Sequence, residues 1–281
     1  MKHANFDSHW LELREPVDHR SRSKELVLLL ANYWMKQEGR RILDLGSGMG
    51  SNLRYLSPYL GKKSQHWTLL DHDSSLLEMI ETPIQKHLTI SPFLGDLREE
   101  GLQLIRDNDL VTGSALLDLT SRGWLDELTE KCANQSCPVY FSLSYTGEVS
   151  WHSTANKETD VESLEHHSRI CNIFNRHQLR DKGTGPALGP SAVSRLNQLF
   201  KSKGYVTKCY SSPWLLNYED RELKKLLIQG WVHSALEECP EESEIINSWA
   251  RSSLRLACSS NSILRVSHLD FLALPNTTDS P

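Results

Sequence analysis

Short apolar runs alternate with segments of helical spacing along the first half of the chain. Five runs are brief, apolar and bounded by glycine or polar residues, as buried parallel strands are: 41–45, 67–71, one ending near 95–96, one starting at 109–112, and 139–143. Four segments before or between them have helical spacing: 26–35, 52–60, 74–80 and 124–132. Pro58 should shorten or kink the second of these helices. Strands alternating with helices predict an α/β fold, with a doubly wound, mostly parallel sheet covered on both faces.

The pattern breaks after Tyr145 and returns near residue 191. Residues 146–190 are polar and rich in His, Gly and Pro, so we expect an inserted cap after the fifth strand. A helix, a sixth strand, two helices and a seventh strand should follow at 191–203, 205–210, 220–238, 241–256 and 263–274, then a frayed tail at 276–281. We expect a single domain with four parts: an N-terminal helical segment (1–39), a core (40–145), the cap (146–190) and a C-terminal part (191–275).

Composition and charge narrow the range of partners. The 281 residues are 38% hydrophobic and 24% charged, which is typical of a globular protein. The net charge of −5 argues against broad binding to nucleic acid or anionic membranes. The first 24 residues contain no apolar signal core, and the longest aliphatic run, 26–31, is far shorter than the roughly 20 residues that span a bilayer. Six scattered cysteines without a CxxC pair favour reduced thiols and a cytoplasmic location.

A glycine-rich loop follows the first predicted strand. Glycines stand at 46, 48 and 50, and Asp44 precedes the first of them by two residues. Glycine lets the backbone approach a ligand closely, because it has no Cβ. A dinucleotide fingerprint needs its third glycine at position 51, where this chain has Ser51, and the Gly-Lys-Ser/Thr of a P-loop is absent. A carboxylate beside the loop would repel a pyrophosphate but could pair with an ammonium group.

This D-x-G-x-G-x-G loop resembles that of the class I S-adenosylmethionine-dependent methyltransferases. Asp71 ends the second strand, and Asp96 follows the third, at the positions of the family's ribose and adenine acids. The segment 112–116 matches the one that passes beneath the methionine moiety, and 266–270 resembles the family's last strand. The resemblance covers residues 40–145 well and the C-terminal third loosely.

The resemblance implies S-adenosylmethionine as the cofactor and S-adenosylhomocysteine as the product. It implies that Asp44 and the loop hold the methionine end, that Asp71 binds the ribose, and that Asp96 bonds the adenine amine. His72 departs from the family's usual apolar residue, although its ring could still stack on the adenine. The full set of expected cofactor residues is Asp44, Gly46, Ser47, Gly48, Gly50, Asn52, Asp71, His72, Asp96, Leu97 and Ser114.

A narrower resemblance concerns segments outside the core. Residues 11–19, 50–56 and 174–190 are similar to those of a group of largely uncharacterised bacterial class I methyltransferases, which names no substrate. Residues 14–22 either line the mouth of the cofactor site, as N-terminal helices do in this fold, or form an exposed charged face.

The expected cap supplies candidate acceptor-site residues. His177 is the candidate base because its unperturbed pKa lies near neutrality, and Tyr145 and Glu148 are further catalytic candidates. Cationic side chains would suit an anionic acceptor such as a carboxylate, and the candidates are Arg176, Arg180 and Lys182. Alternatively, 175–182 is a solvated helix end and 183–190 a plain linker.

Several classes of methyltransferase can be weighed against the motifs. The [DNS]-P-P-[YFW] motif of amino-methylating nucleic-acid enzymes is replaced by Ser-Ala-Leu-Leu at 114–117. Cys137-Pro138 reverses the order found in cytosine C5 enzymes, and His166-His167 lacks metal-ligand spacing, so no metal is expected.

A small-molecule acceptor is therefore favoured, with no membrane partner and nucleic acid disfavoured. A protein or RNA methyltransferase and a non-catalytic S-adenosylmethionine-binding protein remain alternatives. An aminopropyl transferase would need an acidic polyamine channel that the sequence does not reveal.

Overall fold

The computed structural model describes residues 7–81, 86–153 and 166–276. The expected tail beyond residue 276 and the part of the expected cap at 154–165 lie outside the described residues.

One mixed sheet runs through the molecule. Its strands follow the order β3-β2-β1-β4-β5-β8-β6, and a short strand, β7, also pairs with β8. Strands β1 to β5 are parallel, whereas β8 is antiparallel to β5, β6 and β7. The strand bounds are β1 (Arg41–Leu45), β2 (Gln65–Asp71), β3 (Leu88–Leu94), β4 (Leu110–Ser114), β5 (Val139–Ser153), β6 (Val206–Ser211), β7 (Trp214–Leu216) and β8 (Ser262–Leu274).

Helices cover both faces of the sheet because successive side chains of a strand point to opposite sides. Ile42 of β1 packs into a cluster with side chains of α2 and α3, while its neighbour Leu43 packs with those of α6 and α8. The helix bounds are α1 (Ser8–Ser21), α2 (Lys24–Trp34), α3 (Ser51–Leu56), α4 (Ser74–Glu78), α5 (Leu102–Leu104), α6 (Arg122–Asn134), α7 (His167–Gln178), α8 (Ala192–Ser202), α9 (Arg221–Glu238) and α10 (Ser243–Ala257). These two layers confirm the doubly wound arrangement and the seven-strand path, to which β7 adds a short eighth strand.

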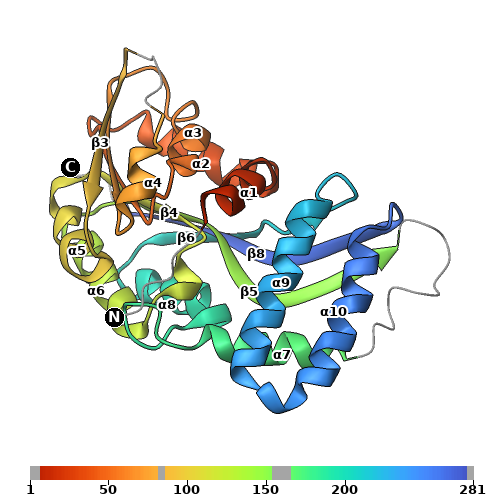
Figure 1. Ribbon diagram of the computed structural model, residues 1–281. Helices are drawn as coiled ribbons and strands as arrows, with labels where there is room; N and C mark the ends of the chain where they lie inside the picture. Colours follow the sequence, from red (N-terminus) through yellow and green to blue (C-terminus); the bar gives the residue numbers. More distant parts are fainter. Residues whose placement is uncertain (1–6, 82–85, 154–165, 277–281) are drawn as a thin grey trace.

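A third apolar cluster lies on the outer half of the sheet. The long strands β5 and β8 extend beyond their neighbours, and α7, α9 and α10 gather around this extension (Figure 1). Trp151, Trp231 and Trp249 are buried there together with residues of α1 and β7. None of the described helices combines the length and the apolar character needed to cross a membrane.

The fifth strand is longer than the sequence analysis predicts. The strand was expected at 139–143 with a cap from residue 146, but β5 continues to Ser153 and pairs with β8 throughout, apart from two shifts in register. On this outer part Val149 and Trp151 alternate with polar residues, and Trp151 is buried while its neighbour His152 is exposed. A strand with one buried face lacks the continuous apolar run that identified its first half.

A buried lysine in the third cluster allows a test of this packing. Lys224 of α9 is fully buried, and its Nζ has no hydrogen-bond partner among the described residues. Burial lowers the pKa of this amine. Because a buried ammonium group without a hydrogen bond is costly, and its contact with the Trp151 ring at 5.9 Å offsets only part of that cost, Lys224→Met should raise the free energy of unfolding by about 1 kcal/mol. Chemical denaturation measures this, with Lys225→Met as the control because Lys225 reaches Glu222 at the surface; a loss of stability on Lys224→Met would contradict the account.

Candidate functional site

The glycine loop connects β1 to α3 in a conformation that requires its glycines. Gly46, Gly48 and Gly50 all have positive φ, at 64°, 51° and 79°, and Gly50 is the N-cap of α3. A Cβ at Gly46 would also lie 3.2 Å from the side chain of Leu116. The loop is fixed from the neighbouring strand, because the backbone N–H of Ser47 donates to the carbonyl of Leu70 at 3.0 Å.

A buried polar network lies beneath the loop. Asn52 donates from Nδ2 to Asp44 Oδ1 at 2.7 Å and to Thr112 Oγ1 at 3.1 Å. Arg22, at the end of α1, donates to Asn52 Oδ1 at 2.6 Å and to Ser114 Oγ at 3.0 Å. This network connects α1, β1, α3 and β4 through side chains alone.

Asp44 is the acid of this network. It is fully buried, and its Oδ2 has no partner among the described residues. Burial raises the pKa of Asp44 to about 7, against the opposing effects of Asn52 and Arg22. A buried carboxylate oxygen without a donor is a place where a bound donor would be stabilised.

Asp71 holds the loop from the end of β2. Its Oδ2 accepts from the backbone N–H of Gly48 at 2.7 Å, and its Oδ1 accepts from that of Asp73 at 3.1 Å. His72 Nδ1 lies 3.4 Å from the same Oδ1. Asp96 follows β3 and caps the turn Leu97–Gly101 by accepting from the N–H of Arg98 at 2.7 Å.

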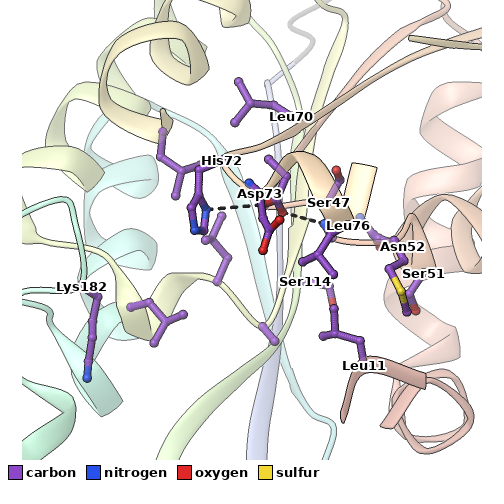
Figure 2. Close-up of a pocket in the computed structure, with 18 of the residues that line it drawn as sticks. Leu11, Ser47, Ser51, Asn52, Leu70, His72, Asp73, Leu76, Ser114 and Lys182 are labelled. Carbon is purple, nitrogen blue, oxygen red and sulfur yellow. Dashed lines mark hydrogen bonds and ion pairs between the residues drawn. The ribbon is translucent and has the colours of Figure 1, made fainter. Parts of the chain in front are cut away.

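These features surround one pocket at the carboxyl ends of β1, β2 and β4, which Figure 2 shows in close-up. In that view Lys182 lies on the opposite side of the pocket from Ser51 and Asn52. The lining residues are Leu11, Arg14, Glu15, Asp18, Gly46, Ser47, Gly48, Met49, Ser51, Asn52, Leu70, Asp71, His72, Asp73, Leu76, Asp96, Leu97, Ser114, Ala115, Leu116, Leu119, Thr120, Lys182, Gly183 and Thr184.

Helix α1 forms one wall of the pocket, and Arg14, Glu15 and Asp18 are among the residues that line it. This placement agrees with the expectation that residues 14–22 line the site, and not with an exposed charged face. Two ion pairs fix this wall. Arg14 Nε lies 2.9 Å from Asp18 Oδ2, and Arg54 of α3 donates to both oxygens of Glu15 at 2.7 and 2.5 Å. Helix α1 is therefore attached directly to the helix that begins at the glycine loop.

The expected cofactor residues converge on this pocket. Nine of them line it: Gly46, Ser47, Gly48, Asn52, Asp71, His72, Asp96, Leu97 and Ser114. Asp44 and Gly50 lie just outside the lining, the first in the buried network and the second at the start of α3.

The expected acceptor residues are dispersed. Of the six, Lys182 lines the pocket. Tyr145 and Glu148 belong to the extension of β5, where the Tyr145 hydroxyl donates to Asn175 Oδ1 at 3.0 Å and Ser267 Oγ donates to Glu148 Oε2 at 3.5 Å.

The remaining three acceptor candidates are on or just after α7 and face α9. His177 Nε2 lies 3.0 Å from Glu237 Oε2, and burial lowers the pKa of His177. Arg180 pairs with Glu237 and Glu238 at 3.4 and 2.7 Å, and Arg176 approaches Glu238 at 3.8 Å. These ion pairs connect the three residues to α9. His177 does not line the pocket, so the geometry does not favour it as a base there.

Sequence analysis did not predict Asp118, and it included Arg22 in the range 14–22 without predicting its contacts. Arg22 reaches Asn52 and Ser114 over 30 and 92 positions, and no local pattern signals such a contact. Asp118 is buried between the lining residues Leu116 and Leu119, and its Oδ1 accepts from the N–H of Tyr145 at 3.4 Å. Burial raises the pKa of Asp118 to about 6, while Arg14 and Lys182 act in the opposite direction. The available signal was its position four residues after the end of β4, at the same edge of the sheet as the other acids.

Comparison with known proteins supports the fold. No protein-family model matches the chain, and no curated protein sequence matches it. Among solved structures, a cyclopropane-fatty-acyl-phospholipid synthase-like protein from Lactobacillus casei is similar at 16% identity and a TM-score of 0.53, over 95% of this chain and 96% of that chain. An S-adenosylmethionine-dependent methyltransferase from Geobacter sulfurreducens, in complex with S-adenosyl-L-homocysteine, is similar at 15% identity and a TM-score of 0.44, over 98% and 100%. The strand order and the Lactobacillus likeness confirm the expected class I methyltransferase-like fold.

Proposed function

We propose that this protein is an S-adenosylmethionine-dependent methyltransferase that acts on a small molecule. The observation that supports this most strongly is the glycine loop, whose backbone is held by Asp71 at the edge of a pocket where three parallel strands end. Ligands of open α/β sheets bind at this edge, and the acids around the loop favour a cationic ligand over a pyrophosphate.

The residues present fit the cofactor. The unpartnered Oδ2 of buried Asp44 suits an ammonium group, and each oxygen of Asp71 retains a lone pair for a ribose hydroxyl. Asp96, Leu97 and His72 all line the pocket, in keeping with an adenine site. When bound, S-adenosylmethionine supplies an electrophilic methyl group on a sulfonium.

The chain's own contribution is positioning and exclusion of water. Methyl transfer is an in-line displacement, so holding the acceptor against the methyl group provides much of the rate enhancement. Leu11, Leu116 and Leu119 line the pocket and would keep water from the sulfonium. Helix α1, fixed by the Arg54–Glu15 pair, forms one wall of the pocket and would help to exclude water.

Protein or RNA as the acceptor is the second candidate class, and a labelling experiment separates it from the first. A cell extract would be incubated with the protein and S-adenosylmethionine labelled in its methyl group, then divided by ultrafiltration. After chromatography separates unreacted S-adenosylmethionine, we expect a labelled product in the small-molecule fraction, above the background measured with Asp71→Ala as the matched control. Label confined to protein or RNA would contradict the small-molecule proposal, and no transfer with either protein would favour the non-catalytic alternative.

A further inference from the structure

The residues around Lys182 form a rigid turn that closes one side of the pocket. Asp181 Oδ1 accepts from the backbone N–H groups of Gly183 and Gly185 at 2.8 and 2.9 Å, and both glycines have positive φ. Thr184 Oγ1 accepts from the N–H of Ser121 at 2.9 Å, which ties the turn to the segment after β4. Lys182 is therefore held in place by its neighbours, and this segment is more than a plain linker.

Lys182 differs from the other charged residues of the lining in having no partner. Arg14 is paired with Asp18. Glu15 is paired with Arg54. Among the described residues, none forms an ion pair or a hydrogen bond with Lys182 Nζ, although the side chain is half-buried. Burial, followed by the nearby charge of Arg180, lowers the pKa of Lys182, so an anion in contact with it would be stabilised.

The surroundings of Lys182 combine an apolar wall with two acids, Glu237 and Asp118, and the cation Arg180. Leu116 and Leu119 line the pocket on the segment to which the turn is tied. Asp118 lies between these leucines in the chain, and its negative charge acts to raise the pKa of Lys182. Arg14, on α1, is the other cation that acts on Asp118. A ligand here would meet an ammonium group and an apolar surface, with the Asp118 carboxylate opposing its negative charge.

We propose that this side of the pocket is the acceptor subsite, and that it takes a small carboxylate with an apolar body, held by Lys182 and packed on Leu116 and Leu119. The proposal rests on the proposed methyltransferase function for its place beside the cofactor. Of the three cationic residues expected to bind the substrate, the proposal keeps Lys182 alone, because Arg176 and Arg180 form ion pairs with acids of α9.

Paired isosteric probes test the charge preference directly. Benzoate and benzamide, and hexanoate and hexanamide, would be titrated by calorimetry into the protein saturated with S-adenosylhomocysteine. We expect each carboxylate to bind at least about five-fold tighter than its amide, since a charge-assisted hydrogen bond is stronger than a neutral one. Equal binding of both members of each pair, or binding of neither, would overturn the proposal.

Two substitutions with opposite expected effects test whether Lys182 and Asp118 are the charged groups that act on the bound carboxylate. Lys182→Gln should weaken carboxylate binding about ten-fold and leave the amides unchanged, whereas Asp118→Asn should tighten carboxylate binding about three-fold by removing a like charge. Arg169→Gln is the control, because Arg169 is a cation outside the lining that pairs with Glu242 of the helical layer, and it should change neither. Unchanged carboxylate affinity in both Lys182→Gln and Asp118→Asn would overturn the assignment.

Affinity for S-adenosylhomocysteine, measured on the same samples, separates the two proposals. Retained affinity with no carboxylate preference refutes the subsite alone. Loss of S-adenosylhomocysteine binding in the wild-type protein refutes the proposed function.

Discussion

Replacing Asp71 by alanine is expected to weaken the binding of S-adenosylhomocysteine by at least ~100-fold, since two charge-assisted hydrogen bonds of about 1.5 kcal/mol or more each would be lost. The carboxylate has two tasks in this account. It would accept from the ribose hydroxyls, and it fixes the loop through the N–H of Gly48 and the following turn through that of Asp73. Calorimetric titration of the variant measures the loss.

Asp73→Ala is the control for this substitution. Asp73 also lines the pocket, but its carboxylate caps α4 by accepting from the N–H of Ser75 at 2.9 Å. We expect its affinity for S-adenosylhomocysteine to stay within about three-fold of wild type, because a helix cap contributes only about 1 kcal/mol to stability and none of it directly to the ligand. Wild-type affinity in Asp71→Ala would remove Asp71 from the site.

Affinity for S-adenosylhomocysteine is also expected to rise with pH through neutrality because of Asp44. Burial raises the pKa of Asp44 to about 7 in the ligand-free protein, so its carboxyl is largely protonated at pH 6. An ammonium group at Oδ2 favours the charged form, so binding must release a proton at that pH. For one group of this pKa the affinity should increase roughly eight-fold from pH 6 to pH 7.5.

Asp44→Asn tests this assignment at two points. The variant should lose about 2 kcal/mol of binding free energy at pH 7.5, as expected for one charge-assisted hydrogen bond, and its affinity should no longer depend on pH in this range. Titration in buffers of different ionisation enthalpy counts the protons released on binding. A wild-type affinity that is flat or falls from pH 6 to pH 7.5 would contradict the role of Asp44.

Much of the sheet and the convergence of the glycine loop and strand-end acids on one pocket could be predicted, because local signals determine them. Strands β1, β2, β4 and the first half of β5 contain short apolar runs, and the glycines at 46, 48 and 50 occur where the backbone adopts positive φ. Asp71 and Asp96 end parallel strands, so they must lie at the same edge of the sheet as the loop. The predicted helix at 52–60 ends early, at Leu56, as the nearby Pro58 led us to expect.

The acceptor side could not be predicted because long-range packing determines it. Whether His177 faces the pocket or α9 depends on how α7 lies against α9, and its partner Glu237 is 60 residues away. The extension of β5 depends on pairing with β8 more than a hundred residues later. Because of these contacts, α7 packs against α9, and Lys182 is the one of the three expected cationic residues that lines the pocket.

The most direct test of the central claim is calorimetric titration of the wild-type protein with S-adenosylhomocysteine and S-adenosylmethionine, with NAD as the control ligand. The account predicts that the first two bind at one site with micromolar affinity and that NAD does not bind, because Asp44 disfavours a pyrophosphate and position 51 lacks the third glycine of a dinucleotide loop. Binding of NAD alone, or of none of the three, would contradict it.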